Sequence, residues 1–173
     1  LQGLALEAQA DDPDGARRTF RAAAPVLQVA EQREHAAGVQ PSPSRVRAFM
    51  GELEIREGRL ADARAHLAAA AQRDPSPDVL LSLARIDWHE KKADAALASL
   101  KAARGVPSRH PALDGEVLLL TAEIQKAQGQ VDAARNTLSE ALRGLTKARA
   151  TRDPEERARI ELVLSRVLDR FGA

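Results

Sequence analysis

One short apolar pattern occurs four times in the sequence and restricts what the chain can fold into. A small residue is followed four positions later by a large apolar residue and seven positions later by another small residue, as in Ala63, Leu67 and Ala70. This spacing places the three side chains on one face of an α-helix. The other copies are Ala16/Phe20/Ala23, Ala96/Leu100/Ala103 and Ala134/Leu138/Ala141. A helix face made mostly of alanine lets a neighbouring helix approach closely, so the pattern predicts tight helix-on-helix packing.

A second pattern precedes the last three copies at identical offsets. It places a large apolar residue, a small residue and a Leu or Ile on the buried face of an earlier helix. The three sets are Val46, Met50, Gly51 and Leu53; Val79, Leu83, Ala84 and Ile86; and Val117, Thr121, Ala122 and Ile124. Each unit is therefore expected to be a first helix, a short turn and a second helix. Self-similarity at a period of 33 to 38 residues is typical of solenoid proteins.

Residues 44–77 resemble the tetratricopeptide repeat (TPR) family. The matching residues are Gly51 in the first helix, Gly58 in the turn, Ala63, Leu67 and Ala70 in the second helix, and the terminal Asp74-Pro75. The resemblance covers roughly residues 1–145, although Arg47 replaces one aromatic of the first helix and Glu54, Asp87 and Gln125 replace another. It implies an all-α fold, a right-handed α-solenoid of antiparallel helix pairs; a related helical-hairpin repeat is the alternative.

We expect a single repeat domain over residues 1–173. Its units are expected at 1–38, 44–77, 78–112 and 113–150, with helices over 44–57, 60–73, 77–90, 93–104, 113–128 and 131–149. Between 25 and 43 there is an insertion, in which Pro25 either kinks a helix or begins a new one. The chain begins at Leu1 within a helical pattern, so we expect it to be part of something longer.

A final helix is predicted over 154–171. Asp153-Pro154-Glu155-Glu156 has the spacing of a capping box with Pro at the first helical position. A broad apolar stripe follows, formed by Ile160, Val163, Leu164, Val167, Leu168 and Phe171. This helix is expected to be either a cap or the first helix of a further unit.

Composition limits the classes of function. The 26 basic and 25 acidic residues leave a net charge of +1, which gives no reason to propose a nucleic-acid or membrane partner. A basic cluster near the C-terminus is interleaved with acids, which favours a solvated face. No apolar run is long enough to span a membrane. The excess of Arg over Lys and the many alanines hint at a GC-rich bacterial gene. The absence of cysteine is compatible with either the cytoplasm or the periplasm of a bacterium.

The sequence shows no pattern typical of a catalytic, cofactor or metal site. The four histidines, His35, His66, His89 and His110, have no metal-ligand spacing. The serines lack a nucleophile motif and the glycines form no phosphate-binding loop. We therefore expect a non-enzymatic protein without cofactors.

The resemblance to TPR proteins implies that the first helices line a concave, partner-binding groove. The candidate residues include Arg45, Glu52, Ile55, Arg56, Leu81, Arg85, Trp88, His89, Glu116, Glu123 and Lys126. Trp88 beside Arg85 is typical of a binding hot spot for a peptide or helix, although Trp88 filling a junction between hairpins is the alternative. Glu52, Arg85 and Glu123 stand where carboxylate-clamp TPRs carry Asn, which argues against binding of a chaperone C-terminus.

The expected function is a protein–protein interaction module or scaffold. The alternative is a sensor or regulatory segment of a larger signalling protein, such as a bacterial kinase or transcription regulator. Open solenoid ends predict self-association. Within the second helix of residues 44–77, Ala68 is expected on the outer face.

Overall fold

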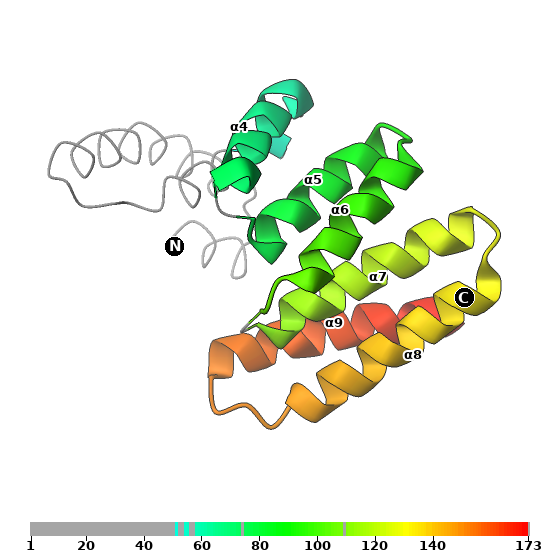
Figure 1. Cartoon of the computed structure of the whole chain (residues 1–173). Helices are drawn as coiled ribbons and strands as arrows, with labels where there is room; N and C mark the ends of the chain where they lie inside the picture. Colours follow the sequence, from blue (N-terminus) through cyan, green and yellow to red (C-terminus); the bar gives the residue numbers. More distant parts are fainter. Residues whose placement is uncertain (1–50, 52–53, 56–57, 74, 109, 173) are drawn as a thin grey trace, which may run out of the picture. The chain divides into compact units, whose positions relative to one another are not determined.

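The structure is a computed structural model that describes residues 51, 54–55, 58–73, 75–108 and 110–172. The described part is all-α, and no strand occurs within it (Figure 1). Its helices are α4 (Leu60–Arg73), α5 (Pro77–His89), α6 (Ala93–Gly105), α7 (Pro111–Ala127), α8 (Val131–Ala148) and α9 (Pro154–Gly172). Gly51, Glu54 and Ile55 are also helical.

The chain divides into two compact units, Leu1–Asp74 and Pro75–Ala173. Helix α4 belongs to the first unit, and α5 to α9 form the second. The division lies close to the expected boundary between the repeats 44–77 and 78–112. The expected unit 1–38, the insertion at 25–43, Ala16/Phe20/Ala23 and Val46, Met50 and Leu53 lie outside the described residues.

The predicted helix positions are confirmed in the described part. Helix α4 has the predicted bounds, and α5, α6, α8 and α9 each end within one residue of the prediction. Helix α7 begins two residues earlier than predicted, at Pro111. Proline suits this place because the first turn of a helix has no use for its missing N–H and its fixed φ is already helical.

The three described copies of the small–Leu–small pattern are buried, each residue being at most 7% exposed. In the first helices, Val79, Ala84 and Ile86 are buried, and so are Val117, Ala122 and Ile124. Leu83 and Thr121 are only half-buried. The placement of Ala68 on the outer face is wrong, because Ala68 is half-buried. It follows Leu67 by one residue, so it lies about 100° round the helix, at the edge of the contact.

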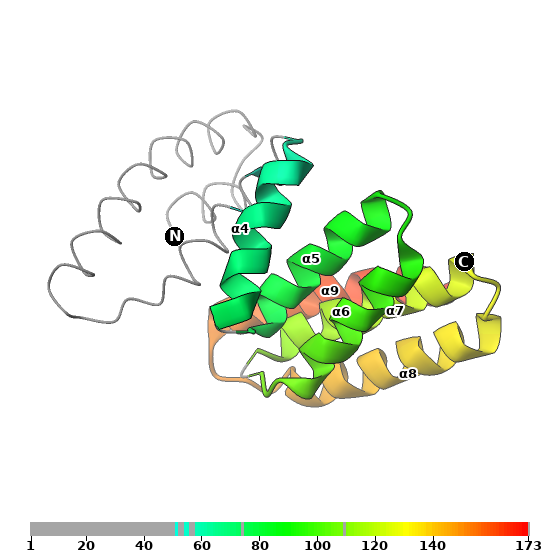
Figure 2. The ribbon, with the colours of Figure 1, turned by 45° about the horizontal axis from the view of Figure 1, so that its top comes forward.

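In the second unit each helix contacts the next one along the chain, and α7 also contacts both α5 and α9. Figures 1 and 2 show α5 beside α6 and α7 beside α8, with α9 next to both α7 and α8. A continuous apolar core joins α7, α8 and α9. Its larger members are Leu118, Leu119, Leu138, Leu145, Ile160, Val163, Leu164 and Val167.

Three turns end the first helices in the same way. One residue of each turn is left-handed: Gly58 with φ +76°, and Lys91 and Gly129, the second residues after the ends of α5 and α7, with φ +63° and +77°. Its N–H bonds to the carbonyl three residues back, and the next N–H bonds to the carbonyl five residues back, all at 2.8–3.0 Å. These bonds define a Schellman motif, in which glycine is preferred because it has no Cβ. Lys91 carries a Cβ in this conformation, at a cost of roughly 1–2 kcal/mol.

The start of α9 confirms half of the predicted capping box. The Asp153 carboxylate accepts hydrogen bonds from the N–H groups of Glu155, at 2.9 Å, and Glu156, at 3.4 Å. The Glu156 side chain does not return to Asp153. It is 6% exposed, and its Oε1 accepts the N–H of Ala112 at 3.0 Å, in the first turn of α7. One carboxylate therefore joins the beginnings of α7 and α9.

Candidate functional site

Two ion pairs connect α7 with α5 and with α9 in the second unit. Arg85 on α5 pairs with Glu116 on α7. Glu123, farther along α7, accepts a hydrogen bond from Arg170 on α9 at 2.9 Å. We call the surface formed by these four residues the ion-pair face. All four side chains reach solvent, so each pair contributes only about 0–1 kcal/mol to stability.

A hollow of about 470 Å³ lies at the end of α5, beside Arg85. It is lined by Arg85, Trp88, His89 and Lys91, and we call it the Trp88 hollow. Trp88 is half-buried, while the other three residues are exposed. The Lys91 ammonium lies 6.0 Å from the centroid of the Trp88 ring. That distance is within reach of a cation–π interaction.

The structure brings Arg85, Trp88 and His89 together, with Glu123 on the adjoining ion-pair face and Lys126 exposed on the same helix as Glu123. Leu81 is a correction to the predicted groove. It is 2% exposed and therefore leaves no surface for a partner. Ile55 is half-buried in the first unit. The remaining candidates, Arg45, Glu52 and Arg56, lie outside the described residues.

Two residues near this surface were absent from the predicted set. Arg170 was missed because its ion pair joins helices that are far apart in the sequence. Lys91 was missed although the sequence held a signal. It occupies the turn position that the neighbouring repeats fill with Gly58 and Gly129. A charged residue in place of a turn glycine is the feature that would have identified it.

Polar pairs occupy the positions of the missing first-helix aromatics. Buried Glu54 accepts a hydrogen bond from His66 of α4 at 2.7 Å when the imidazole Nδ1 carries its proton. In the second unit, the Thr137 hydroxyl on α8 donates to Gln125 on α7 at 2.9 Å. Asp87, at the same place in α5, is also buried. Glu54 and Gln125 therefore face the second helix of the same repeat and are hydrogen-bonded to it.

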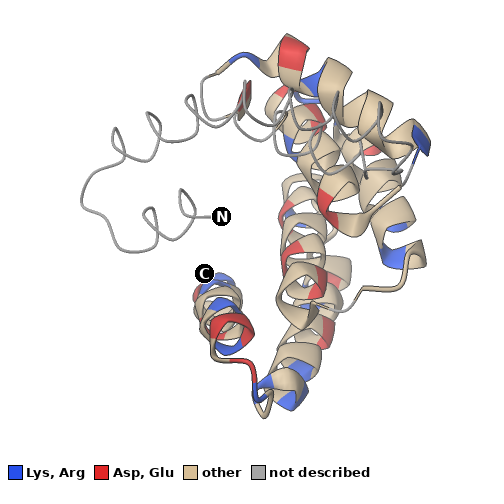
Figure 3. Cartoon of the chain, turned by 90° about the vertical axis from the view of Figure 1, so that its left-hand side faces the viewer, with Lys and Arg blue, Asp and Glu red and all other residues tan. Residues whose placement is uncertain are grey.

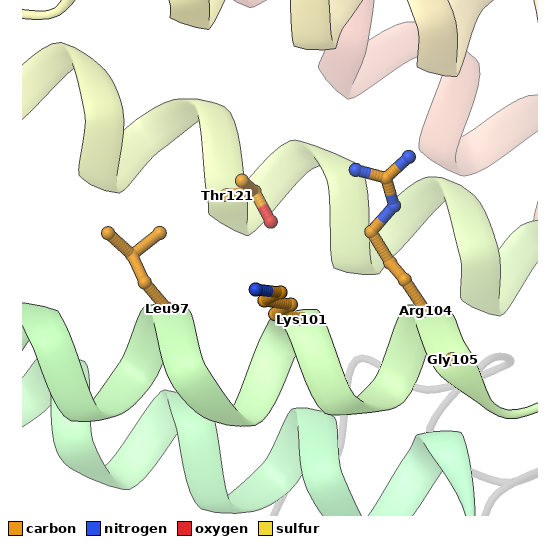
Figure 4. A pocket seen from close by; sticks show the side chains of 5 residues that line it. All are labelled: Leu97, Lys101, Arg104, Gly105 and Thr121. Atoms are coloured by element: carbon orange, nitrogen blue, oxygen red, sulfur yellow. The ribbon is translucent and has the colours of Figure 1, made fainter.

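A second hollow, of about 420 Å³, lies between α6 and α7 (Figure 4). Leu97, Lys101, Arg104 and Gly105 line it from α6, and Thr121 lines it from α7. Two of its polar groups have partners inside the unit. Arg104 bonds to Glu140 at 2.6 Å, and the Thr121 hydroxyl donates to the Val117 carbonyl at 2.7 Å. It makes a weaker candidate than the Trp88 hollow, which has an aromatic ring.

Acidic and basic residues are interleaved along the ribbons of the described helices (Figure 3). Among the described residues, no group of three or more His, Asp or Glu side chains is placed to hold a metal ion. No helix of the described part is both long and apolar enough to cross a membrane. No protein-family model, curated protein or solved structure matches the chain. Functional inference therefore depends on the residues and contacts described above.

Proposed function

We propose that the chain is a non-enzymatic protein–protein interaction module or scaffold, built as a TPR-like right-handed solenoid of antiparallel helix pairs. The partner peptide or helix binds the second unit at the ion-pair face and the adjoining Trp88 hollow. The observation that carries the proposal is Arg85, which belongs to both surfaces: it pairs with Glu116 and lines the hollow beside Trp88.

Two further features support binding at this place. Tryptophan and arginine are the residue types most enriched among binding hot spots. The single ion pair of Arg85 with Glu116 leaves guanidinium donors available, because arginine has five N–H groups in a planar fork. The contacts along the unit, from each helix to the next and between α5, α7 and α9, are those expected of stacked repeats.

The test begins with a pull-down and mass spectrometry to identify a partner, followed by calorimetric titration. Arg85→Glu should weaken binding about tenfold, equivalent to roughly 1.4 kcal/mol. This variant alone is ambiguous, because it places two carboxylates side by side at Glu116. The double variant Arg85→Glu/Glu116→Arg restores an ion pair with its charges exchanged. We expect it to melt like the wild type and still to bind weakly.

A matched control exchanges the charges of another pair between helices. Arg104 on α6 and Glu140 on α8 form an exposed pair away from the Trp88 hollow. Arg104→Glu/Glu140→Arg should bind the partner with unchanged affinity. Equal affinity of the wild type and the Arg85/Glu116 exchange would refute the proposal and direct attention to the surface of α6 and α8.

A further inference from the structure

We infer that the Trp88 hollow recognises an acidic segment of the partner protein, with a Glu or Asp carboxylate of that segment at Lys91 and an aliphatic neighbour against the Trp88 ring. This inference rests on the proposed function and specifies the chemistry of the partner at that site.

The backbone at Lys91 is left-handed, although lysine carries a Cβ. Of the three equivalent Schellman turns, two place glycine in the left-handed position and the third places lysine there. The turn itself needs only a left-handed residue, which glycine supplies without strain. A lysine in this conformation costs free energy that the fold does not require. Strained residues of this kind cluster at binding sites, where the side chain is used.

The Lys91 side chain lies near the Trp88 ring. Its ammonium stands 6.0 Å from the Trp88 ring centroid and lines the same hollow as the ring. An anion that reaches the ammonium therefore also meets the indole. The ring offers a flat apolar surface, which an aliphatic side chain next to the acidic residue would cover.

The charges around the hollow favour an anion. Among the described residues, its lining contains arginine, histidine and lysine beside the tryptophan, and no carboxylate. Of the acids nearby, Glu116 pairs with the lining residue Arg85, and Glu90 accepts a hydrogen bond from Lys92, outside the lining, at 2.7 Å. The lining is therefore complementary to an anion. A carboxylate with several donors around it forms charge-assisted hydrogen bonds, which are stronger than neutral ones.

An acidic peptide fits this hollow better than a nucleic acid does. Nucleic-acid binding needs a track of cations that follows successive phosphates. Around the hollow the cations are confined to the last turn of α5 and the residues just after it, and the described helices elsewhere carry mixed charges. Trp88 is the single tryptophan of the chain, which contains no tyrosine, so aromatic stacking of several bases has no platform here.

Trp88 also supplies the measurement, because its fluorescence reports on this hollow alone. The probe is a synthetic peptide of four glutamates around one leucine, with both ends capped to remove terminal charges. The reference peptide has glutamine in place of each glutamate. We expect the acidic peptide to change the Trp88 emission saturably, with an affinity that falls as salt rises, and the glutamine peptide to leave it unchanged.

Lys91→Gly separates recognition from turn structure. Glycine relieves the left-handed strain, so the melting temperature should rise by a few degrees while affinity for the acidic peptide falls about tenfold. Lys91→Asn, which tolerates the left-handed conformation, should lose affinity in the same way. Lys101→Ala removes the same charge from α6 and should bind like the wild type.

Unchanged affinity in both Lys91 variants, or equal responses to the acidic and glutamine peptides, would overturn the inference. The proposed function fails separately. If a natural partner is weakened by the Arg85/Glu116 exchange and unaffected by Lys91→Gly, the partner uses the ion-pair face without an acidic contact at Lys91. If neither change affects that partner, the binding surface itself is wrongly assigned.

Discussion

Individual small residues set how closely the helices pack. A Cβ added to Gly51 would lie 2.5 Å from Leu67, and one added to Gly115 would lie 2.8 Å from Leu145. Both distances are too short for carbon atoms in contact, which normally stand about 3.5–4.0 Å apart. Gly51 was recognisable from the sequence because it falls in the repeated small position. Gly115 falls outside that pattern, and the need for glycine at this position becomes visible only from its close approach to Leu145.

The carboxyl of Asp114 gives a pH-dependent prediction. Asp114 is exposed, yet partial desolvation of its carboxyl near the start of α7 raises its pKa, and the charge of Glu156 raises it further; a hydrogen bond from Ser108 and the charge of His110 act in the opposite direction. A carboxyl whose folded pKa lies above its unfolded value destabilises the fold when it is ionised. This cost is absent below the unfolded pKa and is fully present once the pH exceeds the raised folded pKa.

Asp114→Asn should therefore be at least as stable as the wild type at pH 7, and the difference should vanish near pH 3. Urea unfolding at the two pH values measures it. Asp132→Asn is the control, because Asp114 and Asp132 are both exposed residues in the first turn of a helix, where a negative charge is favourable, so the two variants lose the same interaction with the helix end. It should not stabilise. A loss of stability in Asp114→Asn at pH 7 would contradict the assigned effect of burial.

At the scale of a helix, the buried alanines predict a strong contrast between neighbouring positions. On α6, Ala96 is fully buried and Ala98 is exposed. Ala96→Leu should overpack the contact and lower the free energy of unfolding by about 1–3 kcal/mol. Ala98→Leu adds the same atoms to a solvated face and should change it by less than about 0.5 kcal/mol. Urea denaturation of both variants measures the contrast, and equal losses would show that the assigned contact face is wrong.

Helix positions were predictable because the determinants are local. The spacing of Ala96, Leu100 and Ala103 defines a face, and Pro111 and Gly129 mark where α7 begins and where the turn after it lies. Surface assignments were less predictable. Leu81 was placed in a groove because the resemblance supplied positions without the depth of packing.

Contacts between distant residues were not predictable from spacing. The bond from Ala112 to Glu156 spans two helices, and nothing in the capping-box spacing distinguishes a glutamate that closes its own helix from one that joins another. The candidate site has the same limit. The sequence placed Arg85 and Trp88 on one helix, while the pairing of Arg85 with Glu116 depends on how α7 lies against α5.

At the scale of the second unit, α9 repeats the register of the first helices. Ile160, Leu164 and Val167 have the spacing of Val117, Thr121 and Ile124 in α7, and all three are buried. The correspondence continues two residues after Ile160, where Leu162 matches Leu119. Leu119 is 2% exposed because α9 belongs to the core around it, whereas Leu162 is 62% exposed. Helix α9 thus presents outward a position that its predecessor buries.

This exposure predicts weak self-association through α9. Leu162 and Leu168, which is 53% exposed, leave apolar area in contact with water, and covering it by a second molecule is favourable. The exposed apolar area is small, and interfaces below about 1,200 Å² are generally weak, so we expect the dimer fraction to rise gradually over a wide range of concentration. Analytical ultracentrifugation over a wide concentration range measures the dimer fraction.

Leu162→Gln/Leu168→Gln should remain monomeric at every concentration. The control Val131→Gln removes a similarly exposed apolar residue at the start of α8 and should associate like the wild type. A wild type that stays monomeric at every concentration would contradict the prediction of self-association. A double glutamine variant that still associates would place the contact elsewhere on the molecule.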